Sequence, residues 1–126
     1  MAQRFFKAVS SMIVCAIDDL FFSIKISTAA KSLGVEVYFE RSADRVLDTL
    51  RSKQPHLAIF DLNSAKMRPL EAIAAVKTDP SLAGCRTLGY VSHVDSETIA
   101  AARQAGVDQV LARSAFVEQL GRILTG

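Results

Sequence analysis

Three aspartates in this sequence directly follow apolar runs, which is where chemistry is expected if those runs are buried strands. Asp18 and Asp19 follow the run 12–17, and Asp61 follows the run 57–60. In an open parallel sheet, ligands bind outside the carboxyl ends of the strands. If the two runs are neighbouring strands, three carboxylates converge, and protonation or a cation must relieve their repulsion. Because oxygen-only ligands favour a hard ion, the cluster predicts Mg²⁺.

Three further polar residues are expected at the same edge. Asn63, in the polar loop after Asp61, can lend a backbone carbonyl oxygen to the ion. Ser92 ends a later apolar run with a hydroxyl, and Arg113 follows another with a fixed positive charge. An acidic pair, a central carboxylate, a hydroxyl and a cation together describe a place that could hold a phosphoryl group.

Each of these residues also has a purely structural interpretation. Asp18 and Asp19 can cap the following helix and complement its dipole, which is worth ~0.3–1 kcal/mol each. Asp61 and Ser92 can be simple turn residues at strand ends. Arg113 can be a phosphate partner or a standing salt bridge to Asp61. The functional interpretation is favoured for the aspartates, because an Asp61 without a function would be repelled by two like charges and nothing would compensate for that repulsion.

Five alternating strand and helix patterns must position these residues. Strands are expected at 12–17, 35–40, 57–60, 87–91 and 109–112. Helices are expected at 21–33, after Ser42, from Pro69 to Asp79, from Ser96 to Gly106, and around the stripe Phe116, Leu120, Ile123 and Leu124. Such alternation predicts a doubly wound α/β fold with five parallel strands and helices on both faces. In the flavodoxin-like strand order 2-1-3-4-5, which is our expectation for this fold, the first and third strands are neighbours.

The patterns also predict which side chains are buried. Phe21 and Phe22 are expected in the core. The strand 35–40 alternates, so the face that carries Glu36 and Glu40 is expected to be wetter, as at a sheet edge. The helix 96–106 is rich in alanine and weakly amphipathic, so it is expected to be the least firmly anchored.

Composition narrows the function classes. The 126 residues fit one domain, expected at 12–126 after an N-terminal extension at 1–11. A net charge of +2 without basic runs argues against nucleic acid. No segment predicts a membrane span or a secretory signal, and Cys15 and Cys85 are expected as reduced core thiols, so a cytoplasmic location is predicted.

The chain resembles the receiver domain of two-component response regulators over nearly its whole length. The segments that carry the resemblance are IVCAIDDLFFSIKI (13–26), LAIFDLNSAKMRPLE (57–71), VSHVDSETIAAARQAG (91–106) and VLARSAFVEQL (110–120). The resemblance implies that Asp61 is the phosphoacceptor, that Asp18 and Asp19 bind Mg²⁺, and that Asn63 lends a main-chain oxygen. Ser92 then takes the place of the switch hydroxyl, and Arg113 stands where the family has lysine.

Four positions around this site depart from the family pattern. They are Arg113-Ser114 for Lys-Pro, Arg68-Pro69 for Asp-Gly, Val110 for an aromatic residue, and His93 for a small residue. The family's bond between lysine and proline is usually cis. A cis bond before a non-proline residue costs ~2.5–4 kcal/mol, so a trans bond and a rerouted loop are expected after Arg113.

The leading hypothesis is a single-domain receiver, a signalling module and not an enzyme. It would accept a phosphoryl group on Asp61 from a histidine kinase or phosphotransfer protein, and would contact a downstream protein through the face formed by 96–106, 109–112 and the last helix. The alternative is a pseudo-receiver that binds proteins without phosphorylation, which Val110, His93 and Arg113 favour. A small flavodoxin-like enzyme or nucleotide binder is disfavoured, because no glycine-rich phosphate loop follows residue 17.

Overall fold

The apolar runs of the sequence form the strands of one parallel sheet. The structure is a computed structural model that describes residues 12–126, so the predicted extension at 1–11 lies outside the described residues. The strands are β1 (Ile13–Ala16), β2 (Val37–Phe39), β3 (Leu57–Asp61), β4 (Arg86–Val91) and β5 (Gln109–Ala112). Their order is β2-β1-β3-β4-β5 and all pairs are parallel, which confirms the predicted topology.

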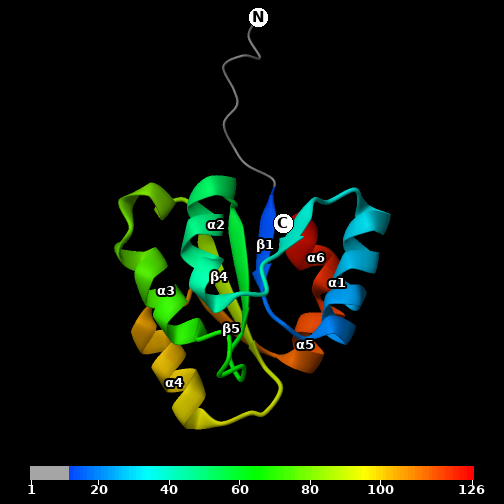
Figure 1. Cartoon of the computed structure of the whole chain (residues 1–126). Coiled ribbons are helices and arrows are strands. Elements are labelled where there is room, and N and C mark those ends of the chain that lie inside the picture. The colour runs from blue at the N-terminus through cyan, green and yellow to red at the C-terminus, as the bar shows by residue number, and fades with distance from the viewer. Residues whose placement is uncertain (1–11) are drawn as a thin grey trace, which may run out of the picture.

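The helices cover both faces of this sheet (Figure 1). One layer holds α2 (Val46–Lys53), α3 (Pro69–Thr78) and α4 (Ser96–Ala105), and the other holds α1 (Leu20–Leu33), α5 (Arg113–Glu118) and α6 (Leu120–Thr125). Short 3-10 helices, η2 (Ala43–Arg45) and η3 (Pro80–Leu82), precede α2 and follow α3. Right-handed crossovers between parallel strands place helices on the two faces in this way.

Two apolar cores follow from the alternation of side chains along the strands. Val14, Ala58 and Phe60 face α2, α3 and α4, whereas Ile13 and Ile59 face α1, α5 and α6. Both cysteines are buried and free. Burial raises the pKa of the Cys85 thiol to about 11 and raises that of Cys15 further, so both thiols stay protonated at neutral pH. Among residues 12–126, no helix is long and apolar enough to cross a membrane.

Several predicted helix boundaries are confirmed by their caps. Gly34 ends α1 in the left-handed conformation (φ 70°), which glycine adopts without steric penalty. Gly106 ends α4 in the same way, with φ 105°. Pro69 is the first residue of α3, as predicted, where its missing N–H has no partner to lose.

Other local expectations are wrong. Ser42 precedes the 3-10 helix η2, without a side-chain cap bond, and α2 begins only at Val46. The C-terminal stripe lies on two short helices that meet at Gln119. Phe22 is buried, but Phe21 is 86% exposed because it lies one residue, about 100° of helix rotation, away from the buried stripe.

The predicted wetter face at 35–40 is confirmed at Glu36, which is exposed, but is wrong at Glu40, just after β2. The Glu40 side chain is buried, with only 5% of its surface exposed. One carboxylate oxygen accepts a hydrogen bond from Thr49 Oγ1 at 2.6 Å, and the other accepts one from the Ser42 backbone N–H at 3.1 Å. A buried carboxylate is tolerated when such partners replace water. Glu40 thereby ties β2 to α2, a tertiary role that strand alternation does not predict.

The helix α4 is weakly anchored, as its composition predicts. Ala102 is its only buried residue, and the helix is otherwise exposed or half-buried. The α2 helix, although shorter, buries both Val46 and Leu50. Because local opening is easiest where few apolar contacts must be broken, α4 is the helix best suited to move.

Gly89 in β4 is required by the close approach of a neighbouring side chain. A Cβ atom at Gly89 would lie 2.7 Å from Cγ and Cδ1 of Leu62, the residue that follows Asp61. Leu62 is itself buried, so it has little room to withdraw. The glycine therefore lets Leu62 pack over β4 and holds the chain just after Asp61.

We expect Gly89→Ala to destabilise the protein by ~1–3 kcal/mol, the usual penalty for overpacking a filled core. Calorimetric unfolding would measure the loss, with about 4 °C in Tm for each kcal/mol in a domain of this size. Gly121→Ala is the matched control, because a Cβ at Gly121 meets nothing within 4 Å. An equal Tm for the two variants would show that Leu62 does not constrain this position.

Candidate functional site

The predicted site residues meet at the carboxyl edge of the sheet. Asp61 is the last residue of β3 and lies opposite Tyr90 of β4 in the ladder. Asp18 and Asp19 follow β1, whose last residue, Ala16, pairs with Phe60. Ser92 and Arg113 follow β4 and β5, which end as the pair Val91 and Ala112. Parallel register therefore brings all the strand-end residues to one edge, as the sequence predicted.

Asp61 occupies the centre of this edge and is half-buried. Its Oδ1 accepts a hydrogen bond from the Asn63 backbone N–H at 3.0 Å. Burial raises the pKa of Asp61 above its usual value, and the charges of Asp18 and Asp19 raise it further. The bond from Asn63 and the charge of Arg113 act in the opposite direction. Asp61 is thus a partly desolvated carboxylate with both positive and negative charges nearby.

Asp19 has two structural partners. Its Oδ1 accepts the Phe22 backbone N–H at 3.0 Å and so caps α1, which is the structural interpretation that the sequence left open. Its Oδ2 lies 3.5 Å from Nη2 of Arg113. The Arg113 guanidinium carbon also lies 4.2 Å from the centroid of the Phe22 ring. The arginine is therefore held between a carboxylate and an aromatic face.

This position of Arg113 corrects one expectation. A salt bridge from Arg113 to Asp61 was one of two alternatives, but the ion pair is formed with Asp19 instead. No loop separates β5 from α5, because Arg113 is already the first residue of the helix. The peptide bond to Ser114 is trans, since residues 12–126 contain no cis bond. Helical geometry at Arg113 directs its side chain back toward the start of α1, which is where Asp19 lies.

Asp18 contacts the loop after β3. Its Oδ1 accepts a hydrogen bond from Ser64 Oγ at 3.3 Å, and its Oδ2 lies 3.8 Å from Nζ of Lys66. Ser64 Oγ in turn accepts the Met67 backbone N–H at 3.2 Å. Asp18 therefore links the end of β1 to the loop that leads into α3. Ser64 and Lys66 were not singled out from the sequence, because polar residues in a polar loop carry no signal of their own.

Asn63 has a role that the sequence did not reveal. Its side-chain oxygen accepts two backbone N–H groups, from Ser92 at 2.7 Å and from His93 at 3.1 Å. The side chain thus bridges the loop after β3 to the loop after β4. An asparagine near a strand end can bond its own loop or a distant one, so this long-range bond could not be read from spacing. The Ser92 hydroxyl is exposed and has no hydrogen-bond partner among residues 12–126.

Tyr90 lies beneath the site and was missed because a tyrosine within an apolar run reads as core. Its ring packs against Phe22 and Phe116, with centroids 4.8 Å and 5.2 Å away. The hydroxyl is buried and unpaired within the described part of the chain. Burial, and then the charge of Asp61, raise the pKa of this hydroxyl, so it stays protonated. Tyr90 therefore presents a neutral donor below the carboxylates.

The donor chemistry of this edge suits a hard divalent cation, since Asp18, Asp19 and Asp61 offer only oxygen. Their arrangement is looser than the sequence suggested. Within residues 12–126, no group of three or more acidic, histidine or cysteine side chains is close enough to hold a metal. Asp19 is drawn to Arg113 and Asp18 to Lys66, so two protein cations already offset the acidic charge.

We expect Asp61→Asn to raise the stability of the protein at neutral pH. The raised pKa means that ionising Asp61 is less favourable in the folded state than in the unfolded state. This loss of folding stability appears as the pH rises through the folded-state pKa of Asp61, and it is absent below the unfolded-state pKa of ~3.9. Calorimetry should therefore show a higher Tm for the variant at pH 7 and equal Tm values at the acid end.

The matched control for this measurement is Glu118→Gln, which removes an exposed carboxylate from α5. It changes the net charge by the same amount without removing a desolvated group, so its Tm should follow that of the parent at both pH values. A lower Tm for Asp61→Asn at pH 7 would show that the ionised carboxylate stabilises the fold.

Comparison with known proteins places this geometry in a known architecture. No protein-family profile matches the chain, and no curated protein matches it in sequence. A response regulator from Hahella chejuensis has a similar structure, with a TM-score of 0.82 and 15% identity over 92% of this chain and 93% of that one. The phosphorylated cyanobacterial phytochrome response regulator RcpA has a TM-score of 0.76 and 23% identity over 94% and 91%.

A third similar structure is the Mn²⁺-bound form of response regulator Rcp1. Its TM-score is 0.73, with 19% identity over 91% of this chain and 89% of that chain. In all three cases the likeness spans nearly the full length of both chains. The chain therefore has the fold of the response-regulator receiver domain.

Proposed function

We propose that the chain is a signalling receiver that accepts a phosphoryl group on Asp61 from a histidine kinase or a phosphotransfer protein. The observation that carries the proposal is the position of Asp61, a half-buried carboxylate at the end of the central strand, between two aspartates and a cation. Transfer forms a bond between an Asp61 carboxylate oxygen and phosphorus and breaks the phosphorus–nitrogen bond of the donor phosphohistidine, whose imidazole leaves with the electron pair.

The surrounding residues can support this transfer. Asp18, Asp19 and Asp61, with the carbonyl oxygen of Asn63, would hold Mg²⁺, and the ion when bound would neutralise charge on the phosphoryl oxygens. The Asn63 N–H fixes the orientation of the Asp61 carboxylate. The Ser92 hydroxyl is free to bond a phosphoryl oxygen, and the Arg113 guanidinium can offer a charge-assisted bond once it leaves Asp19.

The output surface proposed is the face of α4, β5 and α5. Asn63 connects the loop after Asp61 to the backbone of Ser92 and His93, and that loop leads directly into α4. Because α4 is anchored by one buried alanine, a change at Ser92 meets little resistance when it propagates to this helix. A downstream protein that contacts this face would then detect the state of Asp61.

A pseudo-receiver that binds partners without phosphorylation is the second candidate. The ion pair between Arg113 and Asp19 favours it, because a protein cation already compensates part of the acidic charge. Val110 also favours it, since it is half-buried against the core under α4 and is too small to act as an aromatic switch. Both candidates share the fold and the proposed binding face, and they differ only in the reactivity of Asp61.

We expect acetyl phosphate with Mg²⁺ to add one phosphoryl group to the protein, as measured by intact mass. Asp61→Asn should abolish the adduct, whereas Asp48→Asn, which removes an exposed carboxylate on α2, should leave it unchanged. Beryllofluoride should also shift the amide NMR signals of α4 and β5. If the parent chain forms no adduct when Mg²⁺ and acetyl phosphate are in excess, the receiver proposal fails and the pseudo-receiver remains.

Reactivity should increase when Arg113 is replaced together with the next residue. We expect Arg113→Lys with Ser114→Pro to speed the modification of Asp61 by up to about fivefold, because a flexible lysine ammonium can leave Asp19 for the phosphoryl group more easily than the arginine fork, whose partly exposed ion pair is worth ~0.2–1 kcal/mol. The rate is read from the adduct mass over time. Arg51→Lys alters an ion pair with Asp79, at 2.7 Å, far from Asp61 in the fold, and should not change the rate. Equal rates for the parent and the double variant would show that Arg113 is no handicap.

A further inference from the structure

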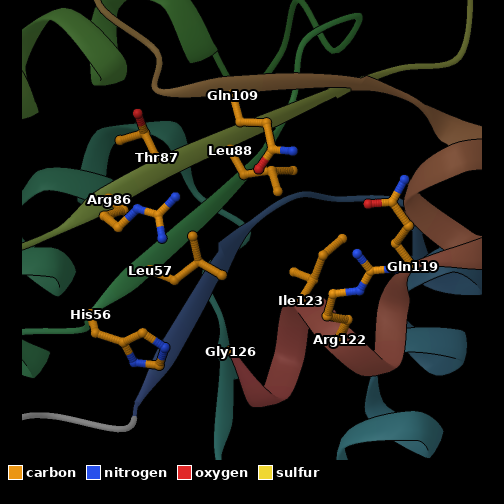
Figure 2. Close-up of a pocket in the computed structure, with 10 residues that line it drawn as sticks. All are labelled: His56, Leu57, Arg86, Thr87, Leu88, Gln109, Gln119, Arg122, Ile123 and Gly126. Atoms are coloured by element: carbon orange, nitrogen blue, oxygen red, sulfur yellow. The ribbon is translucent and has the colours of Figure 1, made fainter.

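A hollow lined by polar and apolar side chains lies at the opposite edge of the sheet from Asp61. It has a volume of about 260 Å³ and is enclosed by the amino ends of β3, β4 and β5 together with α6 (Figure 2). Leu57, Leu88 and Ile123 supply its apolar wall. Because parallel strands end at one edge and begin at the other, this hollow, here called the amino-edge pocket, is separated from Asp61 by the length of β3.

Two arginine side chains line the amino-edge pocket. Arg86 is the first residue of β4 and Arg122 lies in α6, and both line the pocket. No acidic side chain is among the lining residues. Neither guanidinium group has an ion pair or a hydrogen bond to another residue from 12 to 126. Arg51 and Arg113, by contrast, each pair with an aspartate.

Unpaired polar groups on other elements share this pocket. Nδ1 of His56 is buried and has no partner among the described residues, although buried polar atoms are normally satisfied. Gln109 and Gln119 also line the pocket and bring amide donors and acceptors to it. Figure 2 shows these side chains on different walls, with the apolar residues between them. A ligand that accepts several hydrogen bonds would satisfy them together.

We propose that the amino-edge pocket binds a small phosphate monoester that carries a compact apolar group. Two arginine forks and nearby amide donors suit a dianion with three acceptor oxygens, and Leu57 and Ile123 suit its apolar part. The volume lies slightly below the ~300–1,000 Å³ typical of pockets for larger ligands, so the ligand is small. Residues 1–11 carry Arg4 and Lys7 and no acidic residue, so their charge does not complement the pocket.

This site is independent of phosphorylation at Asp61, so it is tested without Mg²⁺ or any phosphoryl donor. We expect phenyl phosphate to shift the amide NMR signals of Gln109, Gln119 and Ile123 in a saturable manner. Inorganic phosphate should bind the same residues more weakly, because it lacks the apolar group, and phenol should produce no saturable shift. These three probes separate an ester from a free ion and from apolar binding alone.

Substitution of the pocket arginines supplies the decisive comparison. Arg122→Gln should weaken phenyl phosphate binding about tenfold, as for the loss of one charge-assisted hydrogen bond, and Arg122→Lys should have an intermediate effect. Arg86→Gln is a second, independent variant on another element. Arg103→Gln, which removes an exposed and unpaired arginine from α4, should bind as the parent does.

Three results would overturn the proposal. They are the absence of saturable shifts at the pocket amides, unchanged affinity in both Arg122→Gln and Arg86→Gln, and shifts confined to the edge that holds Asp18 and Asp61. Equal affinity for phenyl phosphate and inorganic phosphate would assign the pocket to the free ion and overturn the ester.

Discussion

Burial of the sheet on both faces is the constraint from which the site arises. With helices on each side, β1, β3 and β4 must pair all their backbone N–H and C=O groups within the sheet, and their side chains must be apolar. Charged side chains are therefore displaced to the two edges where the strands begin and end. Parallel register then gathers residues that are far apart in the chain, such as Asp61 and Arg113, at the same edge.

At the carboxyl edge, basic side chains of the protein compensate part of the negative charge of the aspartates. Asp19 combines a helix cap with an ion pair, and the same arginine stacks on Phe22. Asp61 has no such cation in direct contact, and burial raises its pKa. The carboxylate that we propose as the phosphoacceptor is thus the one of the three aspartates without an ion pair within residues 12–126, and perturbed carboxylates of this kind are often functional.

The amino edge presents the opposite charge. Within residues 12–126, Arg86 and Arg122 have no ion pair and share a pocket with a buried histidine nitrogen, whereas the aspartates at the carboxyl edge each have partners. The sheet therefore separates the edge at which we propose a cation and a phosphoryl group from the edge at which we propose an anion. Since neither edge shares a side chain with the other, ligands at the two edges can be studied separately.

The sequence by itself determined the parallel strand–helix architecture and most element boundaries, because hydrophobic period and strand–helix alternation are local signals. Together with the resemblance to receiver domains, which implies the strand order, it also indicated the edge at which Asp18, Asp61 and Arg113 meet. Only the tertiary structure decided which partner each side chain takes. Arg113 forms an ion pair with Asp19. The Asn63 side chain accepts a hydrogen bond from Ser92 in the loop after β4, and the buried Glu40 accepts one from Thr49. Those bonds join residues from separate elements, and their choice depends on distances of a few ångströms that spacing along the chain does not encode.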